Sequence, residues 1–141
     1  MKILLDTNVY VAAKNREGNR YSEAMALIED IDEGRLRCVV PTLVIAELCV
    51  GYYQTGDPEG AHELLAGFVS SPSYEIVPLD YETACEAGRL RAELGLKLPD
   101  AIVVATALTT KVNAIVTYDD EMSKLKRYVK VVRPSGVRLR R

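Results

Sequence analysis

A short apolar run at the N-terminus constrains the fold more than any other feature of this chain. Ile3–Leu5 is too short for a helix and fits a strand that is buried on both faces. Asp6 follows directly, which predicts a carboxylate at the carboxyl end of a central strand, where open α/β sheets bind ligands. Taken alone, Asp6 also fits the N-cap of the helix that follows, because aspartate is a favoured capping residue.

Apolar runs alternate with amphipathic segments along the rest of the chain. Further strands are expected at 36–40, 74–77, 114–117 and 130–132, and helices at 7–14, 20–33, 42–53, 59–69, 81–94, 99–108 and 119–125. Asp80 and Gly95 are expected at the two ends of the helix 81–94. This alternation implies an α/β fold with a parallel sheet and right-handed crossovers. With 141 residues and no long linker, residues 1–141 are predicted to form a single domain.

The cysteine and histidine content narrows the chemistry of any site. Cys38, Cys49 and Cys85 are odd in number and far apart, so they suit neither a disulfide framework nor a zinc site. We interpret all three as small core hydrophobes. The only histidine, His62, has no cysteine or serine partner in view, so we expect a surface residue and no histidine-centred catalysis.

Charge and hydropathy exclude two classes of protein. The net charge of −2 argues against a sequence-reading DNA binder, which usually shows a basic excess. The arginines at 133, 138, 140 and 141 make the tail locally basic, and we interpret this tail as a solvated terminus. No segment approaches the roughly 20 apolar residues of a membrane span, and the first residues lack the basic and apolar regions of a signal peptide. We therefore expect a cytoplasmic protein that does not contact a membrane.

Four carboxylates stand out by their positions. Asp6 ends the first strand, Asp100 lies at the start of the helix 99–108, and Asp119 follows the fourth strand. Each of these aspartates alone fits a helix cap. Glu47 lies in the middle of the apolar helix 42–53. If Glu47 is buried, it must be paired or bound to a metal ion, because an unpaired buried charge is costly; it faces solvent if its neighbours turn inward.

The four carboxylates would need a cation if they converge. Two unit charges about 4 Å apart repel each other by about 4 kcal/mol at an effective dielectric of 20. Ligand sets made only of oxygen select Mg²⁺ or Mn²⁺ over zinc. Such ions activate water and stabilise the leaving oxygen when a phosphodiester is hydrolysed. The pattern therefore indicates a metal-dependent phosphodiester hydrolase.

The sequence resembles the PIN domain family, and specifically the VapC-like ribonuclease toxins of prokaryotic toxin–antitoxin pairs. The matching motifs are Leu5–Asn8, the segment around Glu47, residues 98–107 and Thr117–Asp119. They follow one another in the family's order and at its spacing, across nearly the whole chain.

The resemblance implies a three-layer α/β/α fold whose five-stranded parallel sheet has the order 3-2-1-4-5. It also implies a Mg²⁺- or Mn²⁺-dependent endoribonuclease that cuts RNA, forms a homodimer and binds a cognate antitoxin. By motif match, the catalytic acids that bind the metal are Asp6, Glu47, Asp100 and Asp119. The groups expected to support these acids are Thr7, Asn8, Thr117 and Asp120.

Two points within this resemblance stay open. Asp119 falls two residues after Thr117, which matches the family spacing, and Asp120 would then cap the short helix; the two aspartates can also exchange these roles. Tyr52 and Tyr53 add aromatic surface to an apolar helix, and together with the resemblance this surface predicts a two-fold homodimer.

Other proteins also gather acids at strand ends. A receiver-type domain needs an adjacent acidic pair near the first strand, and this strand offers Asp6 alone. A haloacid-dehalogenase-like phosphatase needs a second aspartate two residues later, where Asn8 stands. A PIN domain that binds RNA without cutting it is a third alternative, although the presence of all four acids argues against a decayed site.

Overall fold

The N-terminal apolar run forms the central strand of a five-stranded parallel sheet. In this computed structural model, which describes residues 1–137, the strand order is β3-β2-β1-β4-β5, as predicted. The strands are β1 (Lys2–Leu5), β2 (Arg37–Pro41), β3 (Tyr74–Val77), β4 (Ala114–Val116) and β5 (Val131–Val132). Leu4 pairs with Val39 on one side and with Ile115 on the other. All five strands therefore present their carboxyl ends at the same edge.

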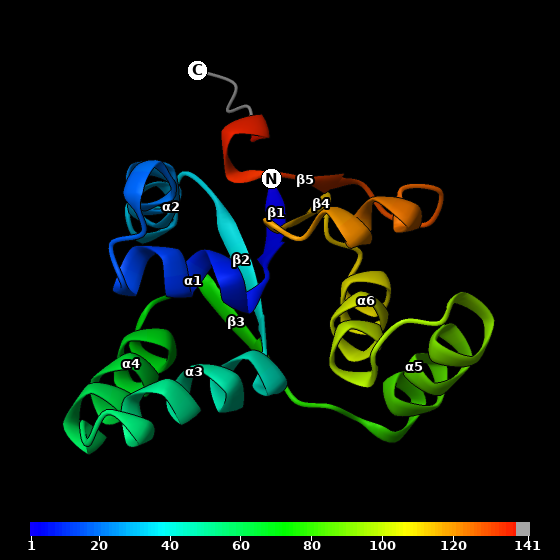
Figure 1. The fold of residues 1–141 in the computed structure, drawn as a ribbon, viewed down its shortest axis with the longest axis horizontal. Helices are drawn as coiled ribbons and strands as arrows, with labels where there is room; N and C mark the ends of the chain where they lie inside the picture. Colours follow the sequence, from blue (N-terminus) through cyan, green and yellow to red (C-terminus); the bar gives the residue numbers. More distant parts are fainter. Residues whose placement is uncertain (138–141) are drawn as a thin grey trace.

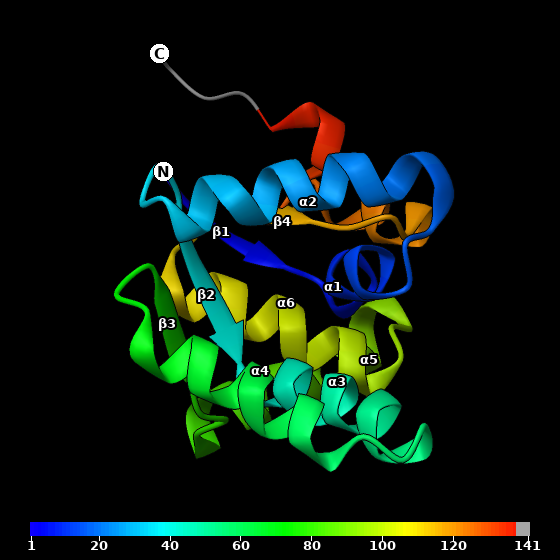
Figure 2. The ribbon, with the colours of Figure 1, turned by 90° about the vertical axis from the view of Figure 1, so that its left-hand side faces the viewer.

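Helices cover both faces of this sheet. The α-helices are α1 (Thr7–Lys14), α2 (Gly18–Asp32), α3 (Thr42–Gln54), α4 (Pro58–Ser70), α5 (Tyr81–Leu94) and α6 (Leu98–Thr110), and the 3₁₀ helices are η1 (Asp120–Leu125) and η2 (Pro134–Gly136). Figure 1 shows α1, α2, α3 and α4 on one side of the molecule and α5 with α6 on the other. Figure 2 is seen from the first side and has α5 and α6 at the back. The predicted three-layer α/β/α architecture is confirmed.

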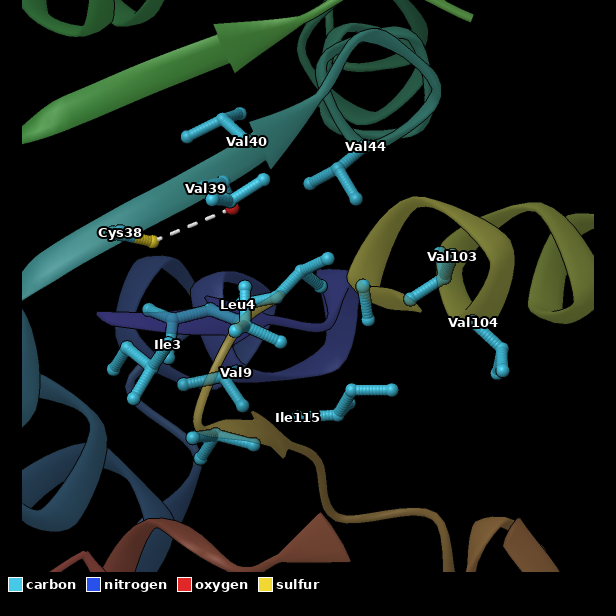
Figure 3. Packing of buried hydrophobic residues seen from close by; sticks show 14 of the residues in the cluster. Ile3, Leu4, Val9, Cys38, Val39, Val40, Val44, Val103, Val104 and Ile115 are labelled. Atoms are coloured by element: carbon cyan, nitrogen blue, oxygen red, sulfur yellow. Dashed lines mark hydrogen bonds between the residues drawn. The ribbon is translucent and has the colours of Figure 1, made fainter. Parts of the chain in front are cut away.

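The core lies where the central strand meets helices from both layers. Ile3, Leu4 and Leu5 are completely buried, as expected for a strand between two helical layers. Figure 3 shows Leu4 close to Val39 of β2, with Val104 of α6 on one side of these strands and Val9 of α1 nearby. This packing holds the end of β1, and with it Asp6, in a fixed place.

The predicted helix boundaries agree with the structure to within two residues. Asp80 caps α5 by accepting a hydrogen bond from the backbone N–H of Thr83 at 2.7 Å. Gly95 ends this helix with φ at 69°, in the left-handed region that favours glycine. α6 begins one residue earlier than predicted, at Leu98, with Pro99 in its first turn.

One prediction about the core was wrong. Cys38 is buried and Cys49 is partly buried, but Cys85 is exposed. The buried stripe of α5 runs through Thr83, Ala87 and Leu90, and position 85 falls off this stripe. His62 is exposed, as predicted. No helix within residues 1–137 is long and apolar enough to cross a membrane.

Candidate active site

Two neighbouring strand ends form the base of the site. Asp6 follows β1, and its backbone N–H donates to the carbonyl oxygen of Val116 at the end of β4, at 2.9 Å. This bond continues the ladder between the two strands by one residue. Thr117 follows Val116 directly, so the sheet itself brings Asp6 and Thr117 together from positions that are far apart in the sequence.

Asp6 is almost completely buried, with 8% of its surface exposed, and its carboxylate is held on both oxygens. Oδ1 accepts from the backbone N–H of Thr7 at 2.8 Å. Oδ2 accepts from the Thr117 hydroxyl at 2.9 Å and, more weakly, from the Asn8 amide at 3.4 Å. Asp6 is thus both the N-cap of α1 and part of a wider network, so the capping interpretation and the site interpretation both hold.

The hydroxyl of Thr117 links Asp6 to Asp119. It donates to Asp6 and accepts from the backbone N–H of Asp119 and from the Asn8 amide, both at 3.0 Å. One donor and two acceptor positions are all that a hydroxyl offers, so Thr117 is fully used. The carbonyl oxygen of the Asn8 side chain accepts from the backbone N–H of Tyr118 at 3.1 Å. Asn8 and Thr117 therefore both contact the Asp6 carboxylate and each other.

Tyr118 ties this strand end to α2. The single proton of its hydroxyl is shared between two acceptors, the carbonyl oxygen of Arg20 at 3.2 Å and the carboxylate of Glu23 at 3.1 Å. Burial and the bond to Glu23 raise the pKa of Tyr118 to about 12, so the hydroxyl stays protonated at neutral pH. The Arg20 guanidinium lies over the ring, 4.5 Å from its centroid. The sequence offered no signal for this anchor.

Glu47 reaches the site from α3 but is not buried. Its side chain faces solvent, and its Oε1 accepts from the Thr7 hydroxyl at 2.8 Å. The solvent-facing alternative is therefore the correct one, and the buried neighbours on α3 are Val44 and Leu48. The charge of Glu47 nevertheless acts on Asp6, because it raises the pKa of that carboxyl group.

Asp100 lies in the first turn of α6 and is partly buried. Its side chain accepts no hydrogen bond from residues 1–137. Burial raises the pKa of Asp100 most, the charges of Asp6 and Asp119 raise it further, and the charge of Lys97 opposes them. Asp100 is therefore no helix cap, and it lies within electrostatic reach of the two strand-end aspartates.

The pKa of Asp6 is affected by burial and also by the neighbouring carboxylates. Burial raises this pKa above its ordinary value, and the hydrogen bonds from Thr117 and from the Thr7 backbone lower it in part. The charges of Glu47 and Asp119 then raise it again. Each of the four predicted acids thus takes part in a mutual repulsion across one region of the molecule.

The neighbouring aspartates Asp119 and Asp120 have different surroundings. Asp119 caps η1 by accepting from the backbone N–H of Glu121 at 3.0 Å. Asp120 turns away and accepts from the Arg133 guanidinium at 2.8 Å, with 84% of its side chain exposed. The expectation that Asp120 would cap this helix was wrong, because Asp119 already fills the capping position. Arg133 also holds the pKa of Asp120 below its ordinary value.

Two charged residues near the site were not predicted from the sequence. The charges of Glu121 and Lys97 both act on the pKa of Asp100, in opposite directions. Glu121 follows Asp119 by two residues, and this short spacing could have identified it as a further acid near the site. The basic tail residues at 138, 140 and 141 lie outside the described residues.

The donor set fits Mg²⁺ or Mn²⁺ better than zinc, because every candidate ligand is a carboxylate oxygen. Within residues 1–137, no three acidic, histidine or cysteine side chains lie close enough together to enclose a metal ion. Mg²⁺ does not require such an enclosure, because it keeps several waters and is usually bound through one or two carboxylates. A cation there would also relieve the repulsion that raises the pKa values of Asp6 and Asp100.

A separate hollow lies away from these acids. It has a volume of about 320 Å³ between α1, α2, α3 and α4, and its walls include Tyr10, Tyr52, Phe68 and Tyr74. It contains none of the four predicted acids, so the hydrogen-bonded strand ends, and not this apolar hollow, are the candidate active site.

The fold is shared with several solved structures. VapBC2 from Rickettsia felis, bound to a DNA fragment from its promoter, matches with a TM-score of 0.71 and 20% identity over 93% of this chain and 97% of that chain. A toxin–antitoxin complex from Klebsiella pneumoniae matches with a TM-score of 0.69 and 24% identity over 94% and 97% of the two chains. VapC20 from Mycobacterium tuberculosis, a sarcin-ricin loop cleaving toxin, matches with a TM-score of 0.69 and 15% identity over 86% and 93%.

Sequence comparison gives the family. No curated protein matches this chain significantly in sequence. The family model described as the PIN domain matches residues 3–128, which include Asp6, Glu47, Asp100 and Asp119. Because that match spans most of the chain, this protein belongs to the PIN domain family.

Proposed function

We propose that this protein is a Mg²⁺- or Mn²⁺-dependent endoribonuclease and the toxin of a toxin–antitoxin pair. The observation that carries the proposal is the network that joins Asp6, Asn8, Thr117 and Asp119 at the carboxyl edge of the sheet. The charges of Glu47 and Asp119 act on Asp6, and Asp100 responds to both aspartates. A bound cation would offset the negative charge that such a site presents to a polyanionic substrate.

Asp6, Glu47, Asp100 and Asp119 are the residues that would hold the metal. Bound there, Mg²⁺ or Mn²⁺ would supply an activated water and a countercharge for the leaving oxygen. The chain itself contributes orientation: Thr117 and Asn8 fix the strand-end carboxylates, and Thr7 steadies Glu47. These supporting bonds have the role that outer partners usually have around metal ligands.

The structural relatives support the biological part of the proposal. The structure from Klebsiella pneumoniae is a toxin–antitoxin complex, and VapC20 is described as a sarcin-ricin loop cleaving toxin. By analogy, this chain would bind RNA as its substrate and a cognate antitoxin as its partner, in the cytoplasm and away from membranes. The analogy rests on fold, so the activity must be tested directly.

Purified protein should cut single-stranded RNA when Mg²⁺ or Mn²⁺ is added and stop when EDTA is added. Glu47→Gln should lose most of this cleavage while it keeps the unfolding temperature of the wild type, because Glu47 is exposed and has one hydrogen bond. Cleavage that survives chelation and ignores Glu47→Gln would refute metal-dependent catalysis. RNA binding with no cleavage under any metal would favour the alternative of a non-cutting PIN domain.

The receiver-type alternative is not supported by the topology. Receiver domains have the strand order 2-1-3-4-5, whereas this sheet has the order 3-2-1-4-5. The first strand is also followed by one aspartate, not by an acidic pair. The proposal therefore stays within the chemistry of the PIN domain family.

We also propose a two-fold homodimer through α3 and α4. Val50, Tyr53 and Val69 are large apolar side chains with 51%, 55% and 68% of their surface exposed. Tyr52 contributes less than expected, because the Lys14 ammonium lies 3.8 Å from its ring centroid and the ring lines the apolar hollow. Sedimentation at micromolar concentration should give twice the chain mass, and a Tyr53→Glu variant should sediment as a monomer.

A further inference from the structure

A polar hollow adjoins the acid site on the side of β5. Its volume is about 330 Å³, and it lies between η1, β5 and η2. It shares Thr117 and Asp119 with the acid site. The polar and charged side chains that it adds are Asp120, Ser123, Lys126 and Arg133. The hollow therefore continues the acid site outward, and its two cations, Lys126 and Arg133, balance the charges of Asp119 and Asp120.

The Arg133 guanidinium faces the carboxylate of Asp120 at the rim of this hollow. One of its terminal nitrogens donates to Asp120 Oδ1 at 2.8 Å, and half of its side chain is exposed. Within residues 1–137 this is the only hydrogen bond that the guanidinium makes. A guanidinium has five N–H donors, so most of its donors stay available to a ligand.

The Asp120 carboxylate shows what kind of ligand this position accepts. Carboxylate and phosphate oxygens match the same fork of guanidinium donors, and a phosphate can take two of these bonds at once. The Asp120 pair is highly exposed, so replacing one anion by another costs little there. Lys126 and the Ser123 hydroxyl line the same hollow and are exposed, which gives a phosphate a second cation and a further donor.

We propose that this hollow binds a backbone phosphate of the RNA strand next to the phosphate that is cut, with Arg133 and Lys126 as its main ligands and Asp120 as the anion that it displaces. The inference rests on the proposed nuclease function and adds a substrate-binding subsite to it. It answers how a chain with a net charge of −2 holds a polyanion beside its most acidic region.

Binding without cleavage gives the first test. In EDTA, the affinity of a fluorescent single-stranded RNA should fall with salt, and the slope of log K against log salt is about −0.7 for each phosphate contact. Because Arg133 and Lys126 contact the same phosphate, Arg133→Ala and Lys126→Ala should each reduce the magnitude of that slope, by at most about 0.7. Arg127→Ala and Lys130→Ala remove the same charges from the same segment outside the hollow, so their slopes should stay near that of the wild type. Asp120→Asn should tighten binding.

Substrates with one neutral linkage give the second test. Once the cut bond is mapped, the phosphate on its 5′ side or on its 3′ side is replaced by an uncharged methylphosphonate. Wild type should lose roughly tenfold in kcat/KM with one of the two substrates, as expected for a charge-assisted hydrogen bond. Arg133→Ala should show the lower rate already and lose nothing more with that substrate.

The outcomes separate the subsite from the proposed function. If wild type binds and cuts RNA but Arg133→Ala and Lys126→Ala behave like their matched controls, the subsite is wrong and the nuclease stands. If neither methylphosphonate is coupled to Arg133, the subsite is equally wrong. If wild type neither binds RNA in EDTA nor cuts it with Mg²⁺ or Mn²⁺, the proposed function fails and takes the subsite with it.

Discussion

The acid site has two halves that are built in different ways. In the half formed by strand ends, Asp6 and Asp119 are joined through one hydroxyl, that of Thr117, and braced by Asn8. In the half formed by helices, Glu47 has a single hydrogen bond, from Thr7, and Asp100 has none from residues 1–137. Asp6 and Thr117 are buried and Glu47 is exposed, while Asp119 and Asp100 are both partly buried.

This difference follows from how the fold positions each residue. Parallel strands bring their ends together through the same ladder that forms the sheet, so the strand-end half is assembled as soon as β1 and β4 pair. The helix half depends on α3 and α6, which place Glu47 and Asp100 across the site without a direct bond to the strand ends. We infer that the strand-end half is preorganised and that the helix half adjusts when a cation binds.

The largest expected effect is the difference in RNA cleavage between variants of Asp119 and of its neighbour Asp120. Asp119→Asn should lower kcat/KM for RNA cleavage by more than the roughly 100-fold that loss of an outer partner of a metal ligand costs. Asp120→Asn should keep most of the activity, because its carboxylate faces Arg133 and not the acid cluster. Initial rates at several RNA concentrations measure both. The reverse result would move the ligand to Asp120 and break the assignment of the strand-end half.

Asn8→Ala tests whether the strand-end half needs the hydrogen bonds of the Asn8 side chain. The change removes bonds to Thr117 and to the Tyr118 backbone but leaves all four acids in place. We expect a loss of about 10–100-fold in kcat/KM and a weaker apparent affinity for Mg²⁺ or Mn²⁺. A metal titration of the cleavage rate measures both quantities. Wild-type metal affinity in this variant would show that the strand-end carboxylates hold their places without Asn8.

Thr7→Val is the matched test of the helix half. Valine has a similar volume to threonine but lacks the hydroxyl. The change therefore removes the only hydrogen bond to Glu47 from residues 1–137. The bond is to a carboxylate, and hydrogen bonds to charged groups contribute about 1.5–3 kcal/mol. Because water can replace this bond at an exposed site, we expect a loss at or below the lower end of that range, less than about tenfold. A loss as large as that of Asn8→Ala would mean that the helix half is also preorganised.

The sequence predicted the strand-end half better than the helix half. Asp6 could be placed because an apolar run of three residues marks a buried strand, and Asp119 because it follows another such run. The sheet order came from the family resemblance. The bond between Asn8 and the Tyr118 backbone depends on which strands are neighbours, and periodicity alone does not give that.

The points that the sequence left open or predicted wrongly also have physical causes. The burial of Glu47 stayed open because apolar residues surround it in the sequence; in the structure α3 buries only one face, which runs through Val44 and Leu48. Asp120 looked like the cap of η1 because two adjacent aspartates compete for one capping position, and only the backbone conformation decides between them. The pair between Asp120, at the start of η1, and Arg133, after β5, has no local signal at all.

The smallest expected effect concerns the contribution of Asp6 to the free energy of unfolding of the metal-free protein. Because burial and neighbouring charge raise the pKa of Asp6 in the folded state, the fold binds its proton more tightly than the unfolded chain does. That contribution to stability is complete below the ordinary pKa of 3.8 and is lost as the pH rises through the higher folded value. At neutral pH, ionised Asp6 therefore costs the metal-free protein stability.

Asp6→Asn should remove this cost, so in EDTA at pH 7 the variant should be as stable as wild type or more stable, by roughly 0–2 kcal/mol. The gain is limited because Asn still caps α1 but cannot accept from Thr7 and Thr117 with two oxygens. The advantage should shrink as the pH falls toward 4, and added Mg²⁺ or Mn²⁺ should stabilise wild type more than the variant. Urea unfolding at both pH values, with EDTA and with metal, measures all three effects. A variant that is clearly less stable in EDTA yet responds normally to metal would make Asp6 a structural cap and leave the metal, if any, to the helix half.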